Sequence, residues 1–149
     1  MSATDRKGIG AFGEAAAISL LEEKGYHILE QNFRFGRYGE VDIVAQTRNT
    51  LCFIEVKTRE HTYFGTAAEA VTYQKRQRII RVANYFITVH QHQKRTLREK
   101  PTIRFDVIEV YIDKIRDGRK TCEKSTEDNK NPDILLVRSI NHIENAFIT

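Results

Sequence analysis

A chain of 149 residues with 40% hydrophobic and 30% charged residues is long enough to bury one substantial core, so we expect a single domain over residues 1–149. A net charge of +4 and an isoelectric point of about 9.1 permit a polyanionic partner without requiring one. The two cysteines argue against a disulfide scaffold or a thiolate zinc site, and the lack of a long apolar run or signal-peptide core predicts a cytoplasmic protein with no membrane partner.

The first predicted element is a helix over about 10–24, ended by Gly25 as a C-cap. Its buried stripe is expected to consist of Phe12, Ala15, Ile18 and Leu21. A strand over 26–33 follows, and Gly36 and Gly39 then punctuate the connection into the next pair of strands.

The segments 39–45 and 51–57 read as a hairpin with a tight turn near Arg48 and Asn49. Successive strand side chains alternate between the two faces of a sheet. If Val41, Ile43 and Ala45 pack on the same core as Cys52, Ile54 and Val56, odd positions must oppose even ones. This register sets Asp42 against Glu55 on the other face, which also carries Glu40, Val44, Phe53 and Lys57.

The second half of the chain predicts one long helix and further strands. A loop is expected over 58–65, and a helix over 67–90 with an outward basic stripe of Lys75, Arg78 and Arg81 that could contact phosphates. Its inward residues would be Ala67, Ala70, Val71, Ile79, Val82, Ala83 and Phe86. A polar segment at 90–100, a strand over 103–112, a mobile loop over 113–132, a strand near 134–137 and a turn through Ile143 and Phe147 complete the chain. This order predicts an α/β fold with a central mixed sheet flanked by helices.

Carboxylates in apolar strands call for a compensating partner, because burying an unpaired charge costs several kcal/mol. Like charges directly opposed across two strands destabilise them, and a bound cation removes that penalty. Two carboxylates with waters and phosphate oxygens suit Mg²⁺. The competing interpretation is that Glu55 and Lys57 form a solvated edge-strand ion pair.

An Asp at the end of one strand followed by Glu-x-Lys on the next resembles the PD-(D/E)xK nuclease superfamily, which has the restriction-endonuclease-like fold and includes archaeal Holliday-junction resolvases. More narrowly, several segments resemble the YraN family: Gly13 and Glu14, residues 39–45, 53–59, Phe64 and Gly65, Lys75, 104–107 and 142–147. The resemblance spans nearly the whole chain. One departure is the missing proline, since Val41 precedes Asp42.

The resemblance implies roles for individual residues. Asp42 and Glu55 would bind Mg²⁺ or Mn²⁺, with the carbonyl of Val56 as a further ligand, and Lys57 would orient the attacking water and offset phosphorane charge. Glu14 would complete the metal site from the first helix, and Gln74 or Lys75 would approach a phosphate. The reaction implied is in-line hydrolysis of a phosphodiester.

Some of these residues also have structural interpretations. Glu14 could be a solvent-facing helix residue, and Glu40 could be a second acid at the rim or a partner for Lys57. Asp106 could pair with Arg104 or with a neighbouring turn, and we assign neither Glu40 nor Asp106 to catalysis.

The function expected from these observations is metal-dependent nuclease activity on nucleic acid, with DNA favoured and branched DNA as one candidate substrate. The alternative is a non-catalytic nucleic-acid-binding module with the same fold, and a third reading is a subunit whose acids bind a basic protein. The sequence leaves the oligomeric state open, although symmetrical cutting of a junction would require two sites related by a two-fold axis, as in a homodimer.

Overall fold

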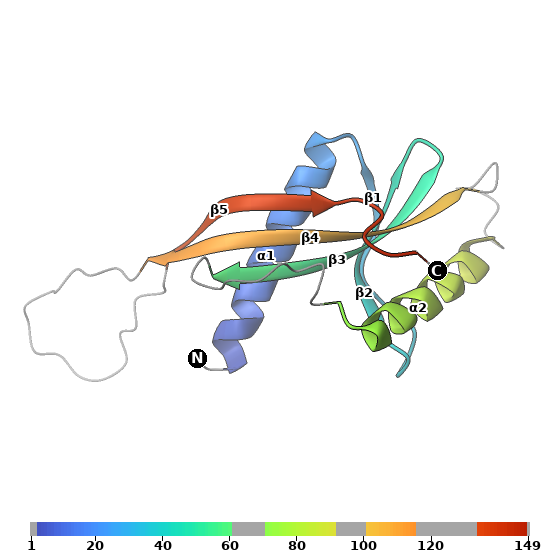
Figure 1. Ribbon diagram of the computed structural model, residues 1–149, viewed down its shortest axis with the longest axis horizontal. Helices are drawn as coiled ribbons and strands as arrows, with labels where there is room; N and C mark the ends of the chain where they lie inside the picture. The colour runs from blue at the N-terminus through green and yellow to red at the C-terminus, as the bar shows by residue number, and fades with distance from the viewer. Residues whose placement is uncertain (1–2, 61–70, 92–100, 116–133, 149) are drawn as a thin grey trace, which may run out of the picture.

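The computed structural model describes residues 3–60, 71–91, 101–115 and 134–148 (Figure 1). Two helices and five strands make up this part of the chain, in the order α1 (Ala3–Glu23), β1 (His27–Arg34), β2 (Glu40–Thr47), β3 (Thr50–Glu60), α2 (Tyr73–Gln91), β4 (Thr102–Ile115) and β5 (Ile134–Ile143). None of the described helices is long and apolar enough to span a membrane.

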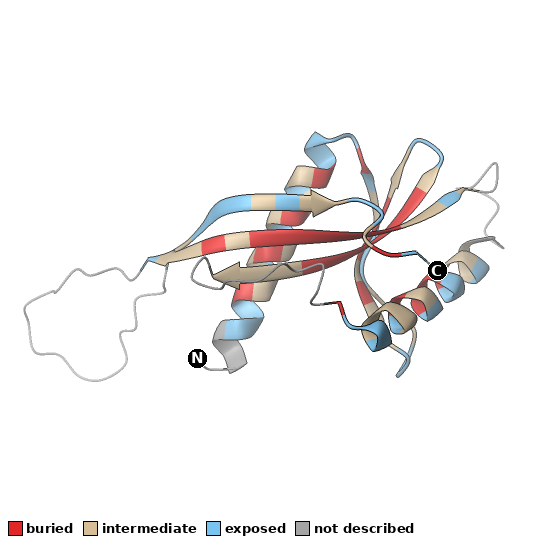
Figure 2. Ribbon diagram, viewed as in Figure 1, coloured by how far each residue is buried: buried red, intermediate tan, exposed pale blue. Residues whose placement is uncertain are grey.

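The strands form one mixed sheet in the order β1-β2-β3-β4-β5. The β3–β4 pair is parallel, and the other three pairs are antiparallel. α1 and α2 cover opposite faces of the sheet, and the most deeply buried stretches are the strands between them (Figures 1 and 2). The predicted α/β architecture is confirmed, and it is consistent with a restriction-endonuclease-like fold.

Both faces of the β2–β3 hairpin are buried, whereas the alternation predicted one core face. Ile43 pairs with Ile54 and Val44 with Phe53, so the predicted odd-to-even register is confirmed. Ile43 and Ile54 pack beneath α1, but Val44 and Phe53 are fully buried beneath α2. Val41 also lies in the core beneath α2, so the prediction that it shares a face with Ile43 was wrong.

The ends of several elements differ from those predicted. α1 begins at Ala3 rather than near residue 10, and its Gly25 C-cap is confirmed by a φ of 80°. Ala15 is exposed, and Ala17 takes the buried place predicted for it. β3, β4 and β5 each extend beyond the predicted strand, because pairing with a neighbouring strand continues into polar residues.

α2 begins at Tyr73, and the hydroxyl of Thr72 accepts a 3.3 Å hydrogen bond from the backbone N of Lys75. Thr72 therefore caps the helix, so Val71 and Thr72, which were predicted to lie within the 67–90 helix, precede it. The segments 61–65, 67–70, 92–100 and 116–132 of the predicted loops and helix lie outside the described residues, as does Cys122.

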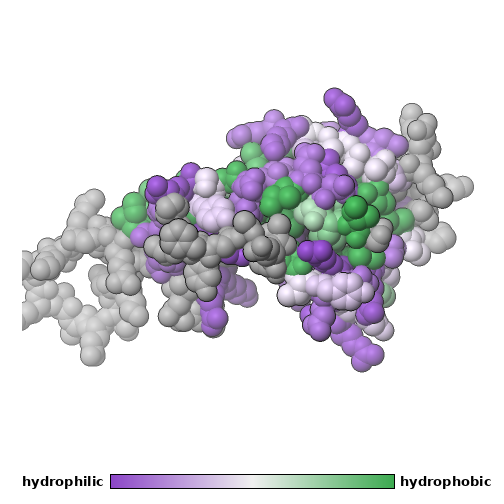
Figure 3. All heavy atoms as spheres, viewed as in Figure 1, coloured by the Kyte–Doolittle hydropathy of each residue, from purple (hydrophilic) through white to green (hydrophobic). Residues whose placement is uncertain are grey.

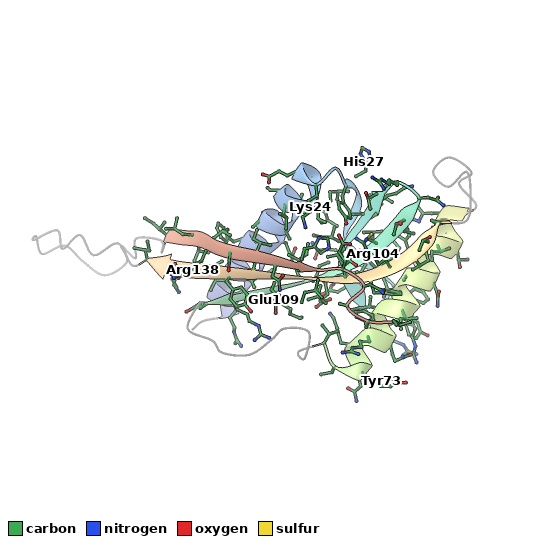
Figure 4. The ribbon with its side chains drawn as sticks, turned by 45° about the horizontal axis from the view of Figure 1, so that its top comes forward. Lys24, His27, Tyr73, Arg104, Glu109 and Arg138 are labelled. Carbon is green, nitrogen blue, oxygen red and sulfur yellow. The ribbon has the colours of Figure 1, made fainter. Side chains whose placement is uncertain are left out.

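A buried ionic cluster around Asp106 joins β4 to β5 and to the turn that follows β5. Asp106 is fully buried and accepts hydrogen bonds from Arg104, from Nε2 of His142 at 2.9 Å and from the backbone N of Asn145 at 2.9 Å. Burial by itself raises the pKa of Asp106, but the bonds from His142 and Arg104 bring it below its usual value. Arg104 lies at the same end of the sheet as Lys24 and His27 (Figure 4). Both structural partners predicted for Asp106, Arg104 and a nearby turn, are confirmed.

Candidate functional site

The site lies where β2 separates from β3. The paired register of the two strands runs from Thr47 and Thr50 to Ile43 and Ile54, and it ends there. At the next position of β2, Asp42 accepts a 2.7 Å hydrogen bond on Oδ2 from the backbone N of Val56. The Asp42 carboxylate thus accepts a β3 N–H that a backbone carbonyl of β2 would accept in a continuous ladder. This hydrogen bond holds the carboxylate beside Glu55.

Glu55 is almost fully buried, at 2% exposure, and two lysines approach one of its oxygens. Oε1 lies 2.6 Å from Nζ of Lys57 on the same strand and 3.3 Å from Nζ of Lys75 on α2. Within the described part of the chain, Oε2 is buried and accepts no hydrogen bond. One carboxylate oxygen therefore faces two cations, and the other is buried without a hydrogen-bond partner among the described residues.

Asp42 and Glu55 repel one another. Burial, followed by the negative charge of Glu55, raises the pKa of Asp42 from 3.8 to about 7. The Val56 N–H and Lys75 act in the opposite direction, and Glu14 adds a smaller upward contribution. Ionisation of Asp42 near neutral pH is therefore costly, and a bound cation would offset that cost.

Glu14 approaches this pair from α1 without completing it. Gly13 allows the approach, because a Cβ there would overlap the side chain of Thr58 on β3. Glu14 accepts a 3.2 Å hydrogen bond from Asn32 Nδ2. Across residues 3–60, 71–91, 101–115 and 134–148, no three His, Cys, Asp or Glu side chains form a group that could hold a metal ion. The role of Glu14 as a third metal ligand stays a prediction.

The donor set of two carboxylates nevertheless fits one hard divalent cation. Mg²⁺ usually binds proteins through one or two carboxylates and keeps several waters, so it does not need a ready-made cage of three protein ligands. The Oε2 atom of Glu55 supplies a buried oxygen that has no partner among the described residues, and Asp42 supplies a second carboxylate whose ionisation is opposed by burial and by Glu55.

The basic residues predicted on α2 take two different positions. Lys75 is partly buried and contacts Glu55, so it belongs to the acidic site itself. Gln74, Arg78 and Arg81 are exposed, which confirms the outward side of the helix. Tyr73 extends from the start of α2, away from Arg104 (Figure 4).

The connection between β1 and β2 adds basic residues that lie outside the Asp42, Glu55 and Lys57 motif. A cavity of about 220 Å³ lies between this connection and α2, and it is lined by Arg34, Gly36, Arg37, Gly39, Glu40, Lys75 and Arg78. Glu40 pairs with Arg34 at 2.6 Å, so the proposed pairing of Glu40 with Lys57 was wrong. The signal in the sequence was the run 34–38, in which arginines alternate with Phe35, Gly36 and Tyr38.

Cys52 is excluded as a nucleophile by its surroundings. Its side chain is fully buried in the core beneath α1, as the strand pattern predicted. Burial raises the pKa of this thiol to about 12, so the thiolate that nucleophilic chemistry needs does not form at neutral pH.

Comparisons with known proteins identify relatives over the whole chain. Residues 13–110 match the model of the uncharacterised protein family UPF0102. A UPF0102 protein of Caldanaerobacter subterraneus subsp. tengcongensis is 36% identical over 147 residues, covering 99% of this chain and 100% of the relative. One from Clostridioides difficile is 40% identical over 143 residues, covering 96% of this chain and 99% of the relative. One from Caldicellulosiruptor bescii is 45% identical over 107 residues, covering 72% and 85%.

Proposed function

The chain belongs to the UPF0102 family, and we propose that it is a divalent-metal-dependent nuclease that hydrolyses phosphodiester bonds in nucleic acid, with DNA as the first substrate to test. The observation that carries the proposal is the Glu55 carboxylate, with one oxygen held by two lysines and the other buried without a hydrogen-bond partner among the described residues. The resemblance to the YraN family and to PD-(D/E)xK nucleases supports it, since Asp42, Glu55 and Lys57 occupy the motif positions.

Asp42 and Glu55 would hold the ion, and the carbonyl of Val56 and Glu14 are candidates for further ligands. When bound, Mg²⁺ or Mn²⁺ would supply Lewis acidity toward the phosphate and the attacking water. Binding requires the ionised form of Asp42, so the ion would offset the repulsion that raises the pKa of this residue to about 7.

The two lysines would act on the substrate. Their side chains are 31% (Lys57) and 29% (Lys75) exposed, so each reaches both Glu55 and the solvent. Lys75 would bind a non-bridging phosphate oxygen, and Lys57 would orient the attacking water and offset the negative charge that develops on the phosphorane.

A non-catalytic nucleic-acid-binding module remains the alternative function. The exposed arginines of α2 and of the β1–β2 connection would serve such a module equally well. The Asp42 and Glu55 carboxylates would weaken the nucleic-acid binding of such a module because they repel phosphate, and they would also lower its stability at neutral pH.

The test is cleavage of labelled branched, duplex and single-stranded DNA by the purified chain in Mg²⁺, Mn²⁺ or EDTA. We expect cleavage in one or both metals, none in EDTA, and a loss of at least about 100-fold in Asp42→Asn and Lys57→Ala. Lys7→Ala, which removes an exposed lysine of α1, is the matched control and should cleave like the wild type. Full cleavage by Asp42→Asn, or none by the wild type in either metal, would reject the nuclease and favour the binding module.

A further inference from the structure

The cavity beside α2 is strongly basic. Four of its seven lining residues are cationic and one, Glu40, is acidic. Arg34 is neutralised by Glu40, whereas Arg37 and Arg78 form no ion pair within the described part of the chain. Like charges held together in a concave surface attract an anion.

The cavity is built into the fold. Gly39 has a φ of 144°, and a Cβ on it would lie 3.3 Å from Cβ of Arg78, so the β1–β2 connection packs directly against α2. The connection is also closed on itself, because the Phe35 N–H donates to the Gly39 carbonyl at 3.0 Å. In Figure 1 this connection lies beside the first turns of α2. Arg37 is therefore carried by a short, internally bonded turn, and Arg78 by the helix against which this turn packs.

A stack of aromatic rings lies next to these cations. Phe35 stacks on Tyr85 with centroids 4.0 Å apart and planes at 10°, and Tyr38 lies on Phe35 at 4.8 Å. Tyr38 is 44% exposed, and the guanidinium of Arg37 lies 5.7 Å from the centroid of its ring. On the face shown in Figure 3, hydrophilic and hydrophobic side chains lie side by side. A basic groove with accessible aromatic rings is the usual means of holding single-stranded nucleic acid.

Lys75 joins this surface to the carboxylate site. It lines the cavity and lies 3.3 Å from Oε1 of Glu55. An anion in the cavity would therefore lie next to the phosphate that Lys75 would bind during the proposed cleavage.

We propose that this cleft holds an unpaired segment of nucleic acid next to the cleaved bond, with a backbone phosphate against Arg37 and Arg78 and a base stacked on Tyr38. The proposal rests on the proposed nuclease function and adds a substrate class, strands with a single-stranded region. A duplex fits less well, because a base inside it is stacked on both sides and offers no free face to Tyr38.

The test measures binding without cleavage. Asp42→Asn, as the full chain in EDTA, is titrated against a fluorescent 20-nucleotide oligothymidine and against a duplex of equal length, at several salt concentrations. We expect tighter binding of the single strand. Adding Tyr38→Ala should weaken binding about 5- to 100-fold with an unchanged salt slope, and Tyr38→Phe should retain it. Adding Arg37→Ala with Arg78→Ala should reduce the salt slope by about 1.4, the value for two lost phosphate contacts on a single strand.

The control is Arg138→Ala, which removes an exposed arginine of β5 from a surface ion pair with Asp113 and should leave binding unchanged. All variants should retain the circular dichroism spectrum and melting behaviour of Asp42→Asn. The proposal is overturned if the duplex binds as tightly as the single strand, or if the Tyr38 and arginine variants bind like their parent. Because binding is measured in EDTA, the two proposals can fail separately. Weaker binding by the Tyr38 and arginine variants, with no cleavage by the wild type in either metal, would support the single-strand site and reject hydrolysis. Cleavage by the wild type, with variant binding equal to that of the parent, would support hydrolysis and reject the single-strand site.

Discussion

The Asp42→Asn substitution is expected to stabilise the metal-free protein at alkaline pH. An amide keeps an oxygen that can accept the 2.7 Å hydrogen bond from the Val56 N–H, and it removes the charge that Glu55 repels. A carboxylate whose ionisation is costly to the fold, placed beside Glu55, is the pattern expected of a site built for binding rather than for stability.

The size of the effect follows from the pKa of Asp42, which is 3.8 for the unfolded chain and about 7 in the folded one. The folded state binds the Asp42 proton more tightly than the unfolded chain does. Ionisation of Asp42 therefore lowers the free energy of unfolding progressively as pH rises from about 4 to 7, and the reduction is complete above about pH 7. Each unit of pKa difference corresponds to about 1.36 kcal/mol, which sets a ceiling of about 4 kcal/mol. We expect a gain of about 1–3 kcal/mol for Asp42→Asn at pH 8.5, or about 3–10 °C in Tm.

Urea denaturation and thermal melting in EDTA at pH 4.5 and pH 8.5 measure this difference. At pH 4.5 the wild-type Asp42 is protonated, so the two proteins should agree within about 0.5–1 kcal/mol. The matched control is Asp113→Asn, because Asp113 forms an exposed ion pair with Arg138, and its substitution should change stability by less than about 1 kcal/mol at either pH. Equal or lower stability of Asp42→Asn at pH 8.5 would refute the reasoning about the repelling carboxylates.

Three further outcomes are expected. Binding of Mn²⁺ to the wild type, measured by calorimetry, should tighten about tenfold per pH unit up to about pH 7 and then level off, since one proton leaves Asp42; a flat profile would contradict this. Arg104→Ala should destabilise the protein by about 3–5 kcal/mol in urea denaturation, because it leaves the fully buried Asp106 without its charged partner, and a loss under 1 kcal/mol would show that His142 and Asn145 suffice. Gly13→Ala should lower the free energy of unfolding by about 1–3 kcal/mol, because the added methyl group would overlap Thr58. Gly10→Ala, in the same helix with open space around it, should leave the free energy of unfolding unchanged or raise it by about 0.5–1 kcal/mol. Equal melting temperatures of the two variants would contradict the close helix–strand contact.

The sequence predicted the features that depend on local periodicity. The order of elements, the β2–β3 register and the Gly25 cap follow from alternation, turn residues and glycine geometry, and these are confirmed. The extension of β5 to Ile143 could not be predicted in this way, because pairing with β4 continues through polar residues such as Ser139 and Asn141.

The candidate site was predictable in part. The acids on adjacent strands and Lys57 were visible in the sequence, but the contact of Lys75 with Glu55 depends on where α2 packs, which no local pattern records. The second core beneath α2 was missed for the same reason, since Val44 and Phe53 were assigned to an open face that α2 covers. The use of Asp42 as an acceptor for Val56 N–H also requires knowledge of where the two strands part.

The parting of β2 from β3 at Asp42 has a mechanical consequence. β2 continues from that point into the turn that carries Arg37 and Tyr38, whereas β3 continues into Lys57. A cation shared by Asp42 and Glu55 would cross-link the two diverging arms, and it would set the position of the turn with Arg37 and Tyr38 relative to Lys57. Loading of the ion would then bring a strand already held by this turn into line with the proposed hydrolytic residues, so the metal-free protein would still bind the strand but would not position the bond to be cut.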